Sequence, residues 1–159
     1  MTLAYVALGS NLNDPRQQVL DAMAALAALP GMQLLARSSL YLTLPWGVLE
    51  QPAFVNAVVL LDTSLTPHAL LDALLELETR AGRVRAERNG PRTLDLDVLH
   101  FDGVQLDDAR LTLPHPRLSQ RAFVLLPLHD IAPALEIPTL GSVRGMLEQV
   151  DSSDCKKLA

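Results

Sequence analysis

Blocks of apolar residues divide the chain into predicted strands and helices. Continuous or alternating apolar runs predict strands at residues 3–9, 32–43, 53–63 and 93–101. Two helices are predicted at residues 15–29 and 67–82. Asp14 precedes a proline at the start of the first helix, a typical helix start, and Pro30 with Gly31 ends that helix.

The order of these elements predicts an α+β fold of the ferredoxin-like, split βαβ type. A mainly antiparallel sheet is expected to carry helices on one face and to leave the opposite face for loops and ligands. After the fourth strand, the sequence predicts a hairpin at Asp102-Gly103, a short helix from Ser119 and a last helix over 142–150.

The chain has 159 residues, the size of one domain, and 49% of them are hydrophobic. We expect residues 1–150 to form that domain and residues 151–159 to form a polar, flexible tail, whose single cysteine, Cys155, is assigned no function. No apolar run is long enough to cross a bilayer, and the N-terminus lacks a signal-peptide pattern. A cytoplasmic protein without a membrane partner is expected, and a monomer, because no feature marks an assembly surface.

The charge is distributed unevenly along the chain. The formal net charge is −5, yet eight of the 11 arginines lie between residues 80 and 121. An acidic protein with one arginine-rich segment is better suited to a small polyanion than to a long nucleic acid.

Two aspartates alternate with apolar residues in the fourth predicted strand. Asp95 and Asp97 should point to one side of it, while Leu94, Leu96 and Val98 point to the other. Two carboxylates about 7 Å apart repel each other unless a positive charge lies near them. That charge could be an arginine or a divalent metal, and oxygen ligands of this kind suit Mg²⁺. The alternative is a solvated outer face of an edge strand.

Arginines precede these aspartates in a loop that ends in a Gly-Pro turn. Guanidinium groups match phosphate oxygens, so a metal held by carboxylates and facing this loop could bind a nucleoside triphosphate. The chain has no glycine-rich phosphate loop that could do so instead. The arginines of this loop are Arg83, Arg85, Arg88 and Arg92.

A second group of residues could bind a planar heterocycle. Phe54 and Asn56 share one face of a predicted strand, and with Phe123 they could form a slot of two rings and an amide. Ordinary core packing is the alternative for both phenylalanines. His115, between two prolines, could contact a phosphate or a base.

Several segments together resemble one enzyme family, 6-hydroxymethyl-7,8-dihydropterin pyrophosphokinase. The resemblance covers about residues 4 to 150. The segments are GSNL (9–12), YLTLPWG (41–47), QPAFVNAV (51–58), GRVRAERNGPRTLDLDVL (82–99), LPHPRLSQRAFVLLPL (113–128) and IAP (131–133). The resemblance implies transfer of pyrophosphate from ATP to the hydroxymethyl group of the pterin, which releases AMP, in tetrahydrofolate biosynthesis.

The resemblance also implies roles for individual residues. Asp95 and Asp97 would hold two Mg²⁺ ions, and Arg83 and Arg92 would assist the transfer. The pterin would contact Thr43, Leu44, Trp46, Phe54, Asn56 and Phe123. ATP would contact Glu78, Arg83, Arg85, Arg88, Arg92, Val98, Arg110, Thr112, His115 and Arg121.

The chain departs from the family pattern at two positions. Asn89 stands where many members have an aromatic residue, and Pro116 where some have a tyrosine. The loop between Arg85 and Arg88 is also one residue shorter than in some members, so closure over the substrates can differ here.

Two other classes of function remain open from the residues alone. A metal-dependent nuclease or nucleotidyltransferase would also use paired aspartates, but it predicts a longer basic track. A ferredoxin-like RNA-binding module predicts exposed aromatic residues on adjacent central strands and a positive net charge.

Overall fold

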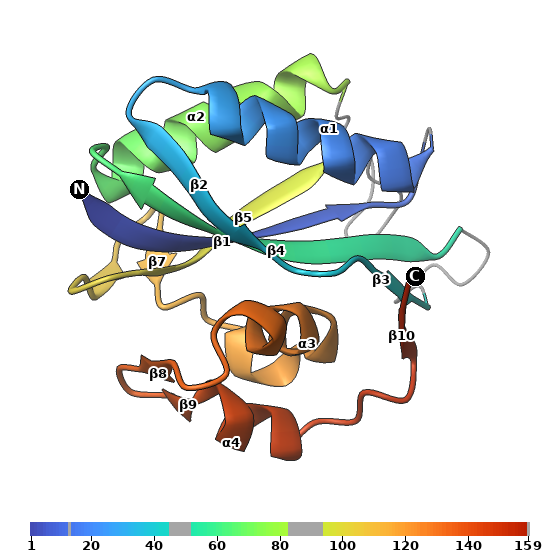
Figure 1. Cartoon of the computed structure of the whole chain (residues 1–159). Coiled ribbons are helices and arrows are strands. Elements are labelled where there is room, and N and C mark those ends of the chain that lie inside the picture. The colour runs from blue at the N-terminus through green and yellow to red at the C-terminus, as the bar shows by residue number, and fades with distance from the viewer. Residues whose placement is uncertain (13, 45–51, 83–93, 159) are drawn as a thin grey trace.

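The structure is a computed structural model that describes residues 1–12, 14–44, 52–82 and 94–158 (Figure 1). The strands of the main sheet are β1 (Thr2–Ser10), β2 (Met32–Arg37), β3 (Tyr41–Thr43), β4 (Phe54–Thr63), β5 (Asp95–Phe101) and β10 (Cys155–Lys157). The helices are α1 (Pro15–Ala28), α2 (Pro67–Arg80), α3 (Ala122–Ile131) and α4 (Val143–Glu148), with a 3₁₀ turn at Leu118–Gln120. Two short ribbons pair β6 (Leu106–Asp107) with β7 (Thr112–Leu113) and β8 (Glu136–Ile137) with β9 (Gly141–Ser142).

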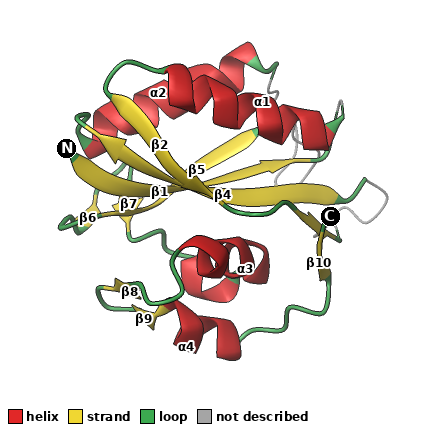
Figure 2. Cartoon of the chain, in the orientation of Figure 1, coloured by secondary structure: helices red, strands yellow, loops and turns green. Residues whose placement is uncertain are grey.

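The main sheet has the strand order β10-β3-β4-β1-β5, and β2 also pairs with β4 (Figure 2). Every pairing in it is antiparallel. Because β2 and β3 lie successively along one edge of β4, they fill the position of a single ferredoxin-like strand. The predicted α+β, ferredoxin-like fold is therefore confirmed.

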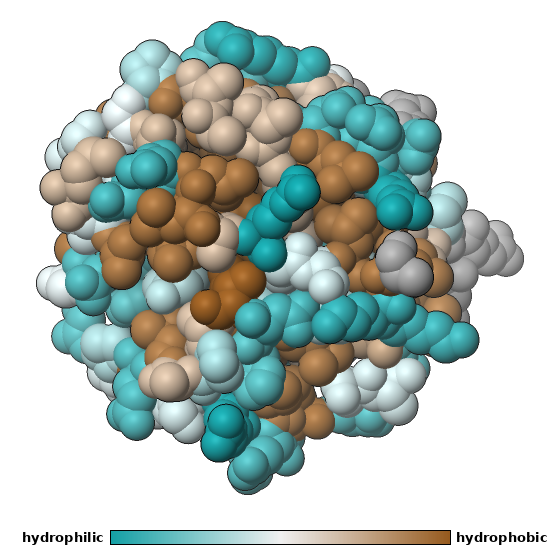
Figure 3. Space-filling view, viewed as in Figure 1, coloured by the Kyte–Doolittle hydropathy of each residue, from teal (hydrophilic) through white to brown (hydrophobic). Residues whose placement is uncertain are grey.

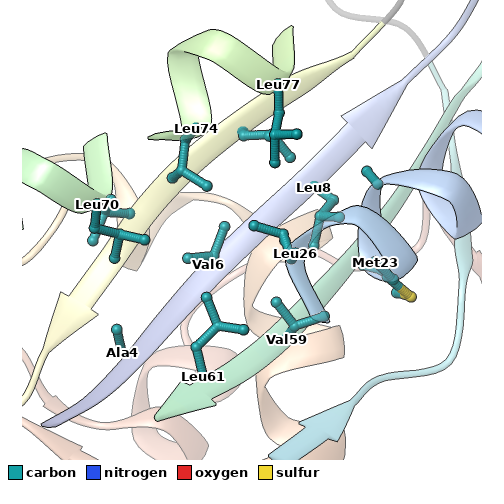
Figure 4. Close-up of a cluster of buried hydrophobic side chains, with 14 of the residues drawn as sticks. Ala4, Val6, Leu8, Met23, Leu26, Val59, Leu61, Leu70, Leu74 and Leu77 are labelled. Carbon is teal, nitrogen blue, oxygen red and sulfur yellow. The ribbon is translucent and has the colours of Figure 1, made fainter. Parts of the chain in front are cut away.

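Helices cover both faces of this sheet (Figure 1). On one face α1 and α2 pack over a cluster that includes Val6, Leu8 and Leu74 (Figure 4). On the other face α3 and α4 cover a second cluster that includes Val58 and Leu125. We expected that second face to be left for loops and ligands, and it is instead shared, because the apolar surface of α3 must also be buried.

The helix starts follow the predicted capping chemistry. The backbone N–H of Gln17 donates to Asp14 Oδ1 at 3.4 Å, and that of Ala69 donates to Thr66 Oγ1 at 3.2 Å. In both helices a proline stands at the first position, where no intrahelical N–H partner is needed.

The long strand predicted at residues 32–43 is interrupted after Arg37. Ser38 N–H donates to the Val58 carbonyl at 2.9 Å, and the Ser38 hydroxyl accepts from Val58 N–H, also at 2.9 Å. A side-chain oxygen thus replaces a backbone carbonyl in the ladder, which ends β2 before β3 begins.

Three further boundaries differ from the prediction. A turn does form at Asp102-Gly103, but the next strand, β6, pairs with β7 rather than folding back onto β5. The helix expected from Ser119 begins at Ala122, after the 3₁₀ turn, and the last helix covers only Val143–Glu148. Short strands and helix ends depend on tertiary partners that local sequence does not reveal.

The C-terminal segment contains a strand that the sequence did not predict. Cys155–Lys157 form β10 and pair with β3 at the edge of the sheet (Figure 1). Flexibility of the remaining tail stays a prediction. No helix among the described residues is long and apolar enough to cross a membrane.

We expect His100 to make the fold less stable at acidic pH. The side chain is 3% exposed, and its ring stacks on Tyr5 with centroids 6.0 Å apart. Burial lowers the pKa of His100, an effect that Asp102 opposes. The unfolded chain would bind a proton below about pH 6.5 while the folded chain resists it, so the free energy of unfolding should fall below that pH.

This pH effect can be measured with urea titrations at about pH 7.5 and about pH 5.5. Between the two, His100→Phe should lose less stability than the wild type, because the variant has no imidazole to protonate. Equal losses would show that His100 does not contribute.

Candidate active site

A cavity of about 380 Å³ lies between the sheet and α3. Residues from β1, β3, β4, β5 and α3 line it, together with residues just before α3. Its lining includes eight residues predicted from the sequence: Thr43, Leu44, Phe54, Asn56, Asp95, Asp97, Arg121 and Phe123. Segments far apart in the sequence thus meet at one site.

Strand register explains how the two aspartates enter this cavity. In the ladder between β1 and β5, Gly9 is opposite Asp95 and Ala7 is opposite Asp97. These small residues leave space above the sheet, while Leu96 is buried on the other face. The predicted alternation is therefore confirmed. Although β5 is an edge strand, both carboxylates line a cavity, so they do not form a plain solvated outer face.

Arg121 supplies positive charge near the aspartates. Its Nη1 lies 3.8 Å from Asp97 Oδ2, and its Cζ lies 5.6 Å from the centroid of the Phe123 ring. The side chains of Arg121 and Asp97 are 27% and 36% exposed, so this ion pair is partly screened by water. One of the two expected sources of positive charge, an arginine, is thus present beside Asp97. Its presence does not exclude the other source, a divalent metal.

The carboxylate pair suits a magnesium site. Within the described parts of the chain, no group of three or more His, Cys, Asp or Glu residues could hold a metal. Mg²⁺ usually takes one or two carboxylates from the protein and completes its shell with water and phosphate oxygens. Asp95 and Asp97, on one wall of a cavity, match that need.

A polar pair forms another wall of the cavity. Asn56 Nδ2 donates to Thr43 Oγ1 at 3.0 Å, and both residues are buried. Gly9 lies so close that a Cβ at its position would be 2.8 Å from Asn56 Oδ1. Glycine therefore leaves space for the Asn56 amide, which a larger residue would have to displace.

Both phenylalanines line the same cavity from different elements. Phe54 comes from β4 and Phe123 from α3, and each is only partly buried. Two aromatic rings, an amide and a hydroxyl could together enclose a flat heterocycle with hydrogen-bonding edges. Core packing, the alternative for these rings, applies in part, since Phe123 also packs against the apolar cluster beneath the sheet.

His115 lies in a neighbouring cavity of about 470 Å³, which Thr112 also lines. Its backbone N–H donates to the Leu99 carbonyl at 2.9 Å, and its Nδ1 accepts from Arg117 N–H at 3.1 Å. Burial, followed by Arg121, lowers the pKa of His115 to about 4. The imidazole is therefore neutral near pH 7, and with Nδ1 accepting, its proton is assigned to Nε2.

A family model described as 7,8-dihydro-6-hydroxymethylpterin-pyrophosphokinase (HPPK) matches residues 5–133, which is most of the chain. The chain belongs to this family. The sequence resemblance is thereby confirmed, and a pyrophosphokinase is favoured over a nuclease or an RNA-binding module. The aromatic residues support this choice. An RNA-binding module would expose them on adjacent central strands, whereas Phe54 and Phe123 line a cavity.

Relatives of this pyrophosphokinase align with most or nearly all of its length. A Methylorubrum extorquens protein named 2-amino-4-hydroxy-6-hydroxymethyldihydropteridine pyrophosphokinase is 48% identical over 158 residues, which are 99% of each chain. The Pseudomonas aeruginosa protein of that name is 54% identical over 134 residues, 84% of this chain and 83% of the relative.

Solved structures show the same fold. A crystal structure of Plasmodium falciparum HPPK-DHPS aligns with a TM-score of 0.73 and 14% identity. The alignment covers 99% of this chain and 47% of the other, so this pyrophosphokinase spans about half the length of that fusion protein. At this identity the similarity concerns the fold alone.

Three predicted ATP contacts have side chains that lie away from the main cavity. Glu78 and Val98 are each 3% exposed, on the α1/α2 face of the sheet, and Glu78 Oε2 accepts from Leu96 N–H at 2.7 Å. The Arg110 guanidinium pairs with Asp72. Their contacts with ATP stay predictions.

Five other predicted residues lie outside the described residues: Trp46, Arg83, Arg85, Arg88 and Arg92. Conversely, sequence reasoning did not select Gly9, Arg117 or Gln120, which also line the main cavity. A glycine near the end of a buried strand was a usable signal for Gly9, because it often marks close approach of another group.

We expect Gly9→Ala to weaken pterin binding by roughly tenfold, because the new methyl group must displace the Asn56 amide. Isothermal titration with the dihydropterin would measure the change. In a double-mutant cycle, Gly9→Ala should add little once Asn56→Ala has removed the clash. Additive effects of the two substitutions would contradict this explanation.

Proposed function

We propose that this protein transfers pyrophosphate from ATP to the hydroxymethyl group of 6-hydroxymethyl-7,8-dihydropterin, a step of tetrahydrofolate biosynthesis, with the pterin in the cavity of about 380 Å³. The observation that carries the proposal is the composition of this cavity. Two rings and a buried polar pair lie in the same space as two carboxylates. A flat heterocycle could thus be held next to a metal-bound triphosphate.

The pterin-binding part is proposed to use both ring and edge contacts. Phe54 and Phe123 would sandwich the ring, while Asn56 and Thr43 would contact its hydrogen-bonding edge, with help from the backbone of Leu44. Trp46 is retained as a further proposed contact. A buried amide is selective, because a ligand that leaves it unpaired pays the cost of desolvation.

Asp95 and Asp97 are proposed to hold two Mg²⁺ ions. When bound, such ions neutralise the triphosphate, polarise the phosphorus that is attacked and stabilise the departing AMP oxygen. The two aspartates extend from one strand, so they would orient the triphosphate relative to the pterin as a unit. Orientation of this kind can supply about 7–11 kcal/mol of the barrier reduction.

Cationic and neutral donors are proposed to bind ATP around this pair. Arg121, already near Asp97, could turn toward a phosphate at small cost, because a partly exposed pair is worth about 1 kcal/mol or less. His115 would donate through Nε2 as a neutral group. The proposed ATP contacts also include Glu78, Arg83, Arg85, Arg88, Arg92, Val98, Arg110 and Thr112, with Arg83 and Arg92 assisting the transfer.

The remaining proposals concern the protein as a whole. Residues 1–150 are proposed to form the catalytic domain, to whose sheet the strand β10 is added, and the protein would act as a monomer in the cytoplasm. Light scattering of the purified protein tests the monomer, since a dimer would double the measured mass.

One coupled assay tests the function. AMP should form from ATP only when 6-hydroxymethyl-7,8-dihydropterin and Mg²⁺ are both present, and excess EDTA should abolish the reaction. AMP formation that depends on added nucleic acid instead would overturn the proposal.

We expect Asp97→Asn to lower kcat by about a hundredfold or more, because it removes charge that orients the metal-bound triphosphate. Binding of Mg²⁺ with an ATP analogue should weaken in calorimetry, while pterin binding changes much less. Asp21→Asn is the matched control, since Asp21 lies on α1 and pairs with Gln17 there. Full activity of Asp97→Asn would exclude the metal-binding role.

A further inference from the structure

The C-terminal strand β10 lies beyond residues 5–133, the part matched by the family model, and yet it pairs with β3, a strand that helps to line the main cavity. Its partner β3 contains Thr43, and the next residue is Leu44; both line the cavity. Figure 1 shows β10 beside β3 at one end of the sheet. The end of the chain thus supports part of the wall of the site.

Backbone hydrogen bonds hold β3 along its whole length. Leu158 N–H donates to the Leu40 carbonyl at 2.8 Å, and Leu44 N–H donates to the Asp154 carbonyl at 3.4 Å. Between them, Lys156 is paired with Leu42. Because bonded positions alternate in an antiparallel ladder, the Lys156–Leu42 pair is also a hydrogen-bonded one. Without β10, the three-residue strand β3 would have an unpaired outer edge.

A chain of side-chain contacts runs from β10 to the polar pair of the cavity. The Thr43 hydroxyl is 3.9 Å from Cys155 Sγ and is placed to donate to it. The same hydroxyl accepts from Asn56 Nδ2 at 3.0 Å. A hydroxyl that donates to sulfur presents its lone pairs to the amide, so Cys155 favours the Thr43 orientation that Asn56 needs.

Side chains of both β3 and β10 also contact α3. The Tyr41 hydroxyl donates to Asp130 at 2.9 Å, and Lys157 Nζ lies 3.9 Å from Asp130 Oδ1. Since α3 carries Phe123, these contacts link the strand on one side of the cavity with the aromatic ring on the other.

Figure 3 shows apolar side chains gathered on one face of the molecule. The second cavity, with Thr112 and His115, belongs to the ATP site already proposed. The C-terminal strand β10, in contrast, is connected with residues of the main cavity by several contacts.

We propose that β10 is a positioning element for the pterin: it fixes Thr43 and Leu44 by backbone pairing and orients the Asn56 amide through Cys155 and Thr43. This inference rests on the proposed function, because it assumes that the pterin occupies the main cavity. Neither Cys155 nor Lys156 is among the residues that line the cavity, so β10 would act through β3 rather than by touching the substrate.

Two substitutions at one position test the backbone part. Lys156→Pro removes the N–H that pairs with Leu42, whereas Lys156→Ala keeps it and serves as the matched control. For Lys156→Pro, the KM for the pterin should rise about fivefold, the effect of one lost hydrogen bond, with the KM for ATP unchanged. A general loss of folded protein would lower kcat and leave both KM values as they were.

Two substitutions at Cys155 test the proposed side-chain contacts through Thr43. They test the proposal even if Lys156→Pro does not fold. Cys155→Ala should raise the KM for the pterin, and Cys155→Ser, which keeps an acceptor, should restore most of the wild-type value. An unchanged pterin KM in folded Lys156→Pro, or in Cys155→Ala, would overturn the proposal, and so would an equal rise in the KM for ATP. If the wild type itself formed no AMP with the pterin, the proposed function would fail instead.

Discussion

Alternation of side chains along β1 is the constraint on which both the core and the cavity depend. Val6 and Leu8 point toward α1 and α2, and they are almost fully buried there. Ala7 and Gly9 point to the other face, where their small size leaves space for the cavity. One strand thus supplies core contacts on one side and space for a ligand on the other.

The second face of the sheet is divided between packing and binding. Near one end, Val58 of the sheet and Leu125 of α3 belong to the apolar cluster that packs between them. Near the other end, α3 begins with residues that face the cavity, among them Phe123. The position of α3 therefore decides where the apolar cluster stops and where the site begins.

The charged side chains Asp97 and Arg121 of the site are only partly buried. A fully buried carboxylate pair would favour protonation, since burial penalises the charged form. Asp97 is instead 36% exposed and lies 3.8 Å from Arg121, so water and a cation both stabilise its charge. A partly exposed ion pair of this kind costs little to rearrange.

Local sequence was sufficient for most of the fold and for the carboxylate pair. Periodicity, the Asp14 and Thr66 caps and their prolines predicted the order of elements, because these signals act within a few residues. The spacing of Asp95 and Asp97 predicted their shared face for the same reason. The ATP-binding roles of Glu78 and Val98 came from the resemblance alone, and the side chains of both residues lie on the α1/α2 face.

Contacts between distant segments were decided only by tertiary structure. The Ser38 hydroxyl replaces a backbone acceptor opposite Val58, which divides the long strand, and no local pattern encodes that pairing. The strand β10 has an intermediate residue and two exposed lysines, so it has no apolar pattern of its own and becomes a strand through its partner β3. Local interactions determine which elements form, whereas contacts across large sequence separations determine where strands end and which side chains share a cavity.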